Sequence, residues 1–175
     1  MGKWSIYSTS HVSTMGSGDF ASNEKSVTIT KAGNLKIQLV NSTGIKILKE
    51  VVPVLEGEII DATLMSKKAL LDFLEVQIAD ANKKGVLFSL HMKATMMKVS
   101  DPIIFGHAVR VYFKSVFEKF GKELNEAGVN VNNGFGNLLT HLNKLTPALK
   151  IEIEAEIKKC FAEGPDLAMV DSDKG

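Results

Sequence analysis

The chain has 175 residues, 45% of them hydrophobic and 23% charged, so it has the size of one globular domain and can bury a core. Its 21 basic and 20 acidic residues are interspersed and leave a net charge of +1, which argues against a nucleic-acid or membrane-surface binder. A single cysteine, Cys160, excludes an internal disulfide, and no apolar run approaches the length of a spanning helix. We therefore expect no nucleic acid or membrane among the partners, and a cytoplasmic location.

The first 65 residues predict a polar segment followed by strands. Residues 1–25 contain turn residues at positions 16–19 and no sustained period, so we expect a loop-like segment. Alternation over residues 26–30, 35–40 and 45–49, with turns between them, predicts a β-meander with one apolar face within residues 26–65. Residues 58–65 can supply a fourth strand.

A helical period begins at Ser66, which is the expected N-cap of a helix that ends at Gly85. A short apolar run over residues 86–91 then predicts a buried strand. After it, Asp101 and Pro102 read as an N-cap and a first helical proline, which predicts a long helix with a break at Gly121.

The last third of the chain predicts two further helices and a strand. A short helix is expected over residues 137–145, and Thr146 with Pro147 begins another that stops near Gly164. Residues 167–170 read as a buried strand. The chain as a whole therefore predicts an α/β or mixed α+β class, with helix and strand layers over residues 66–175 in one domain spanning residues 1–175.

The most informative stretch for function is residues 91–107, which follows the strand at 86–91 directly. It places Lys93, Thr95 and Lys98 at the carboxyl end of a strand, where ligands bind in open α/β sheets. Lys93 is therefore a catalytic candidate. From position alone, a solvated surface lysine is the alternative, because most lysines are surface charges.

No other group of residues in the sequence indicates a metal, phosphate or cofactor site. Four scattered histidines lack zinc spacing, and Gly134-Phe135-Gly136 lacks the preceding strand of a phosphate fingerprint. Asp171 and Asp173 follow a strand, but solvated loop aspartates are the commoner explanation. The phenylalanines at helical spacing between residues 105 and 120 are read as core.

Seven segments of the sequence together resemble the monomeric-type NADP-dependent isocitrate dehydrogenases of bacteria. The resemblance runs from one end of the chain to the other, and it implies a part of the isocitrate/isopropylmalate dehydrogenase-like fold. The segments are MGKWS at 1–5, SHV at 10–12, GEIIDA at 57–62, MSKKAL at 65–70, HMKATMMKVSDPIIFGH at 91–107, GVNVNNG at 128–134 and LAMVDSDKG at 167–175.

The resemblance also assigns roles to individual residues. The Lys-x-Thr-x-x-Lys pattern is similar to the catalytic lysine segment of the dimeric isocitrate dehydrogenases as well, and in both comparisons Lys93 takes the catalytic position. Thr95 would be a neighbouring hydroxyl that binds substrate or orients the lysine, while Lys98 would be structural. The implied reaction is oxidative decarboxylation of isocitrate to 2-oxoglutarate with formation of NADPH, in the tricarboxylic acid cycle and glyoxylate bypass.

Members of this family are several times longer, so the resemblance implies that this chain is an internal fragment of the larger domain of its parent. The sites for NADP and for Mg²⁺ or Mn²⁺ would then lie mostly outside the chain, with no metal ligand within it. We expect the isolated chain to be inactive and the remainder of the parent enzyme to be its partner. A stand-alone, non-catalytic binding or assembly module of the same fold is the alternative.

Overall fold

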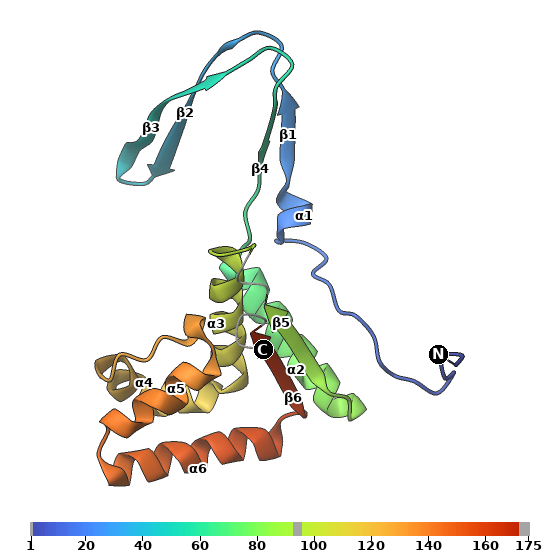
Figure 1. Cartoon of the computed structure of the whole chain (residues 1–175), viewed down its shortest axis with the longest axis vertical. Coiled ribbons are helices and arrows are strands. Elements are labelled where there is room, and N and C mark those ends of the chain that lie inside the picture. The colour runs from blue at the N-terminus through green and yellow to red at the C-terminus, as the bar shows by residue number, and fades with distance from the viewer. Residues whose placement is uncertain (1, 93–95, 172–175) are drawn as a thin grey trace. The chain divides into compact units, whose positions relative to one another are not determined.

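A computed structural model of the chain describes residues 2–92 and 96–171. Two compact units make up the structure: residues 16–66 form one, and residues 1–15 together with 67–175 form the other. The change from strand to helix period that the sequence shows near residue 65 falls at this boundary. Helices and strands are both present, as Figure 1 shows, and the predicted mixed α/β class is confirmed. The single-domain organisation stays a prediction.

The unit of residues 16–66 consists of one short helix and four strands. The helix is stabilised by Asp19, whose carboxylate accepts a hydrogen bond of 2.9 Å from the backbone N–H of Ser22 in a capping box. The sequence predicts a loop here, because four residues are too few to show a helical period. The elements are α1 (Phe20–Asn23), β1 (Lys25–Thr28), β2 (Gly33–Asn41), β3 (Gly44–Val54) and β4 (Ile59–Ala62).

The pairing of these strands differs from the predicted meander. Strands β2 and β3 form an antiparallel hairpin, but β1 pairs with β4 instead of with its sequence neighbour β2. The pairing of these two segments continues at Ile29, the residue after β1. The Ile29 N–H donates to the Glu58 carbonyl at 2.8 Å, and the Ile29 carbonyl accepts from the Gly57 N–H at 2.8 Å. Local turn residues predict where strands end, whereas this pairing is decided by contacts distant in sequence.

The second unit carries most of the helices and a parallel strand pair. Its elements are α2 (Lys67–Lys84), β5 (Phe88–Met92), α3 (Ser100–Tyr112), α4 (Lys114–Glu126), α5 (Phe135–His141), α6 (Pro147–Glu163) and β6 (Leu167–Asp171), with short 3₁₀ turns η1 (Val131–Asn133) and η2 (Leu142–Lys144).

Predicted helix boundaries are confirmed where the signal is local. Helix α2 begins one residue after Ser66 and ends before Gly85, which adopts a φ of +61° that glycine accommodates without strain. Helix α6 begins at Pro147, and the Thr146 hydroxyl accepts a hydrogen bond from the backbone N–H of Leu149 at 3.5 Å.

The prediction for the middle helix is wrong at its N-cap, and it misses one of two breaks. Helix α3 begins at Ser100, so Asp101 lies in its first turn and the N-cap position falls on Val99 without a side-chain cap. The helix breaks at Phe113, between α3 and α4, and a second kink lies inside α4 at Phe120, next to the predicted break at Gly121. Phe113 is fully buried, and its ring stacks on that of Phe135 at a centroid distance of 4.3 Å. Tertiary packing of the Phe113 ring therefore accompanies the break that no local sequence signal marks.

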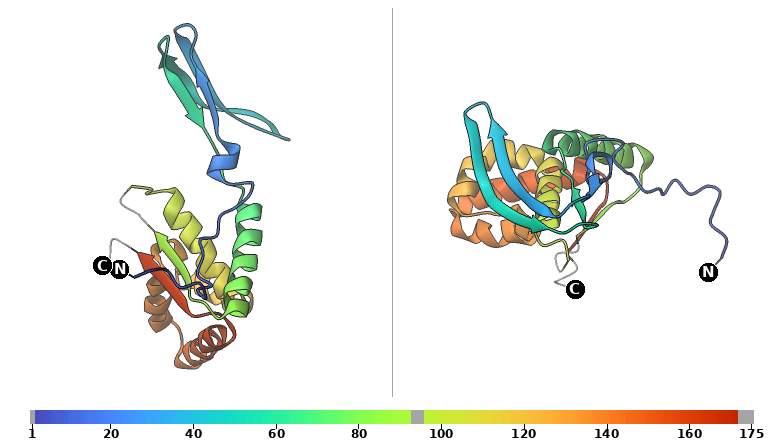
Figure 2. Two further views of the ribbon diagram at one scale, coloured as in Figure 1. Left: turned by 90° about the vertical axis from the view of Figure 1, so that its right-hand side faces the viewer. Right: turned by 90° about the horizontal axis from the view of Figure 1, so that it is seen from above.

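The core of this unit lies between the helices and one face of the strand pair. Figure 2 shows α3 beside β5 and β6, and the partly buried side chains of Leu90, Leu167 and Met169 pack against the helical core. The fully buried large side chains are Phe113, Leu124, Leu138, Leu142, Ile153, Val109, Val116 and Val131. This helical layer supports the strand pair, so the strand ends are held by a packed core.

Candidate functional site

The candidate site lies at the carboxyl edge of the β5–β6 pair. The two strands are parallel and in register from Phe88 opposite Leu167 to Met92 opposite Asp171, so both carboxyl ends meet at one edge (Figures 1 and 2). Ligands bind beyond this edge in open α/β sheets. Because β5 ends at Met92, the candidate Lys93 is the next residue in sequence. Lys93 and Thr95 themselves lie outside the described residues 2–92 and 96–171.

Close packing fixes the helix that leads away from this edge. Gly106 of α3 lies against η1, where a Cβ atom would overlap Oδ1 of Asn132 and lie 3.1 Å from the Asn132 backbone nitrogen. Glycine at position 106 permits this approach without displacement of Asn132. It therefore allows α3, whose first turn faces the candidate site, to pack closely on η1.

The first turn of α3 and the end of β5 enclose a small hollow of about 60 Å³, lined by Leu90, His91, Asp101, Ile104 and Phe105. Asp101 is half-buried and brings a carboxylate beside the strand end. The sequence predicts a helix cap at Asp101, because Pro102 follows it, and it does not indicate that Asp101 lines a hollow.

His91 and Ser89 share the face of β5 opposite to Leu90. Their side chains contact each other, with 2.8 Å between Ser89 Oγ and His91 Nε2. Both side chains are exposed, while Leu90 packs against the core. The Ser-x-His alternation in the sequence is the signal that places both on one face, because strand side chains alternate.

Two other titratable side chains of α3, His107 and Arg110, lie near groups of the neighbouring helices. Burial lowers the pKa of His107, and the nearby charges of Lys67 and Arg110 lower it further. The guanidinium of Arg110 stacks over the Phe117 ring, 4.7 Å from the ring centroid, in a cation–π contact. The chain's single arginine is thus packed on an aromatic ring of α4.

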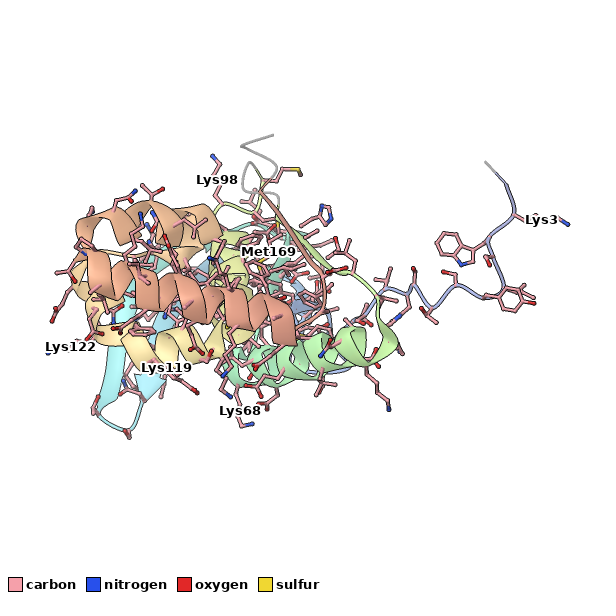
Figure 3. All side chains as sticks on the ribbon, turned by 90° about the horizontal axis from the view of Figure 1, so that it is seen from below. Lys3, Lys68, Lys98, Lys119, Lys122 and Met169 are labelled. Carbon is pink, nitrogen blue, oxygen red and sulfur yellow. The ribbon has the colours of Figure 1, made fainter. Side chains whose placement is uncertain are left out.

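Lys98, the second lysine of the segment, is exposed on the loop before α3 and is labelled in Figure 3 together with Met169 of β6. Within residues 2–92 and 96–171, no group of three or more His, Cys, Asp or Glu side chains could hold a metal ion. Asp171 ends β6, and Asp173 lies outside the described residues. In the same ranges no helix is long and apolar enough to cross a membrane.

A parallel strand pair joined through helices is typical of α/β folds, and Lys93 follows the first of these strands directly in sequence. Comparison with known proteins identifies the family. The family model described as monomeric isocitrate dehydrogenase matches residues 1–175, and the chain belongs to this family.

Three relatives illustrate the likeness. The chain is 51% identical to isocitrate dehydrogenase [NADP] 2 of Colwellia maris, 48% identical to that of Mycobacterium tuberculosis, and 48% identical to isocitrate dehydrogenase [NADP] of Azotobacter vinelandii. Each match covers 100% of this chain and 24% of the relative. The chain thus spans about a quarter of the length of these relatives.

Proposed function

We propose that residues 1–175 form one part of an NADP-dependent isocitrate dehydrogenase, which converts isocitrate to 2-oxoglutarate by oxidative decarboxylation and forms NADPH. The observation that carries this proposal is the identity of 48–51%, along the whole chain, to proteins named isocitrate dehydrogenase [NADP]. The tricarboxylic acid cycle and the glyoxylate bypass are the metabolic setting, and the cytoplasm is the compartment.

In this proposal Lys93 is the catalytic lysine, and Thr95 binds the substrate or orients the lysine. Support for Lys93 comes from its position one residue beyond the end of β5, at the edge where β6 also ends. An ammonium group beside the substrate hydroxyl can take part in proton transfer and stabilise the negative charge that develops as the hydroxyl is deprotonated. Asp101 and His91 line the hollow next to this edge and can orient neighbouring groups by hydrogen bonding.

The described residues do not build the remaining sites. A tricarboxylate is ordinarily held by several arginines in bidentate geometry, whereas Arg110 is stacked on Phe117. The absence of a group of three metal-ligating side chains among residues 2–92 and 96–171 means that these residues do not fit a complete Mg²⁺ or Mn²⁺ site. We propose that the substrate clamp, the metal ligands and the NADP pocket lie in other parts of the enzyme, which are the partner of this chain.

The proposal is tested by producing the full-length polypeptide that carries residues 1–175 and following NADPH absorbance with isocitrate, NADP and Mg²⁺ or Mn²⁺. NADPH formation that requires isocitrate and NADP supports the proposal. A folded full-length protein that forms no NADPH under any of these conditions contradicts it, and favours the non-catalytic binding module.

A further inference from the structure

A buried hydrogen bond joins the end of α3 to the turn between α6 and β6. The Tyr112 hydroxyl donates to the Pro165 carbonyl at 2.6 Å, and both residues are buried. Gly164 lies against the same hydroxyl, because a Cβ atom at position 164 would lie 2.8 Å from Tyr112 Oη and 2.9 Å from the Cys160 carbonyl oxygen. Burial raises the pKa of Tyr112, and Cys160 and Asp166 raise it further. The hydroxyl therefore keeps its proton at neutral pH and remains a hydrogen-bond donor to the turn.

Two further hydrogen bonds hold the same turn. The Asn82 side-chain amide of α2 donates to the Glu163 carbonyl at 2.9 Å, and the Phe88 N–H of β5 donates to the Asp166 carbonyl at 2.8 Å. The bond from Asn82 is exposed, so water can replace it. Loss of the hydroxyl of α3, in contrast, would take the donor away from a buried carbonyl, which is costly. The bond from α3 is therefore the side-chain contact on which the position of the turn depends most.

The turn determines where β6 begins, and β6 ends at the candidate site. Strand β6 starts at Leu167, three residues after Gly164, and pairs in register with β5 as far as Met92 opposite Asp171. Its five residues extend only about 13 Å, so a displacement of the turn along the strand direction reaches the carboxyl edge. A slip by a whole residue would turn Leu167 and Met169 away from the core on which they pack. A perturbed turn should therefore shift β6 by a fraction of a residue and leave the fold intact.

We propose that Tyr112 is a positioning residue, which holds β6 along its axis through the Pro165 carbonyl and so fixes the edge of the β5–β6 pair where Lys93 follows. Its contact lies at the amino end of β6, whereas the edge lies at the carboxyl end, so its effect on the reaction is indirect. A misplacement of about 1 Å can lower turnover about 100-fold even when its cause is distant from the chemistry. The role of this edge in catalysis rests on the proposed function, whereas the contact itself does not.

Tyr112→Phe in the full-length enzyme removes the hydroxyl and keeps the ring, which packs on Phe113 and Phe161. We expect kcat to fall by about tenfold or more while KM for isocitrate and NADP changes by less than about twofold, because the proposed function assigns the substrate clamp and the NADP pocket to other parts of the enzyme. Hydrogen–deuterium exchange followed by mass spectrometry should become faster in peptides covering residues 164–171 and 88–92. Exchange in residues 116–126 of α4 should stay unchanged.

Gly164→Ala perturbs the same contact from the other side. The backbone φ of −90° at Gly164 accommodates alanine, so the new Cβ atom would act through its overlap with the Tyr112 hydroxyl and the Cys160 carbonyl. We expect the same loss of kcat and faster exchange in the same peptides. Because both substitutions disturb one contact, the loss in the double variant should be smaller than the product of the two single losses.

Two control variants separate positioning from a general loss of stability. Tyr7→Phe, at the other tyrosine of the chain and 87% exposed, should leave kcat and the exchange rates unchanged. Ile153→Val removes a buried methyl group from α6, where Ile153 is 0% exposed, and should lower the thermal midpoint while kcat is retained at the assay temperature.

A folded Tyr112→Phe enzyme with unchanged kcat, or with a loss of kcat no larger than that of Ile153→Val, would overturn the inference. Unchanged exchange in residues 164–171 would overturn it as well. If the unsubstituted full-length protein forms no NADPH, the proposed function fails and the catalytic part of the inference fails with it. In that case the exchange of residues 164–171 still decides whether Tyr112 holds β6.

Discussion

The packing of Gly106 against η1 predicts a specific effect of Gly106→Ala. A Cβ atom there would overlap the Asn132 side chain and lie 3.1 Å from the Asn132 backbone nitrogen, which cannot rotate away as a side chain can. Overpacking of this kind costs about 1–3 kcal/mol. The higher helix propensity of alanine adds about 1 kcal/mol to the free energy of unfolding. We therefore expect a net decrease of about 1 kcal/mol in the free energy of unfolding.

The matched control is Gly121→Ala in α4, because a Cβ atom at Gly121 would meet no atom within 4 Å. This substitution should stabilise the chain by about 0.5–1 kcal/mol. The two variants should therefore differ in thermal midpoint by several degrees, with Gly106→Ala the lower.

The assay is thermal and urea unfolding followed by far-ultraviolet circular dichroism, which reports on the helices. Tryptophan fluorescence would report poorly, because Trp4 is 75% exposed. If Gly106→Ala stabilised the chain as much as Gly121→Ala does, the close approach of α3 to η1 would be refuted.

Three further predictions concern the core, the pH dependence and the activity of the chain. Ile153→Ala should lower the free energy of unfolding, measured in urea, by about 2–5 kcal/mol because Ile153 is 0% exposed. Ile151→Ala, at a position 66% exposed, should change this free energy by less than about 0.5 kcal/mol. The hydrogen bond from Lys119 lowers the pKa of Glu156 below its usual 4.5. The ionised Glu156 carboxylate should therefore stabilise the fold at pH values above 4.5, and this contribution should be lost as the pH falls through the lowered pKa. Lys119→Met should weaken this acid dependence of the thermal midpoint while Lys122→Met, at the exposed lysine also labelled in Figure 3, should preserve it. Purified residues 1–175 should form no NADPH from isocitrate and NADP, because the proposed function assigns the residues that position substrate to other parts of the enzyme. Metal-dependent NADPH formation by this chain would contradict the site assignment.

Sequence patterns predict the parts of this fold that depend on local signals. Thr146 and Pro147 locate the start of α6, and Gly85 locates the end of α2, because caps and positive φ angles depend on one or two residues. The apolar runs at 86–91 and 167–170 predict β5 and β6 to within two residues, because the composition of a short strand is also a local signal.

What the sequence does not predict depends on distant contacts. The break at Phe113 results from a ring packed between helices, and the pairing of β1 with β4 joins segments separated by about thirty residues in the chain. In the candidate site, the strand end before Lys93 is predictable from the pattern. The inclusion of Asp101 in the lining of the hollow is not, because it depends on where α3 packs.

The central claim, that this chain carries the catalytic lysine of an isocitrate dehydrogenase, is tested most directly by the turnover of Lys93→Met in the full-length enzyme. The substitution removes the charge and keeps most of the side-chain volume, so we predict that turnover falls by orders of magnitude while the thermal midpoint changes little. Lys98→Met, at the exposed second lysine of the segment, serves as the matched control and should retain turnover. Near-normal turnover of Lys93→Met would contradict the claim.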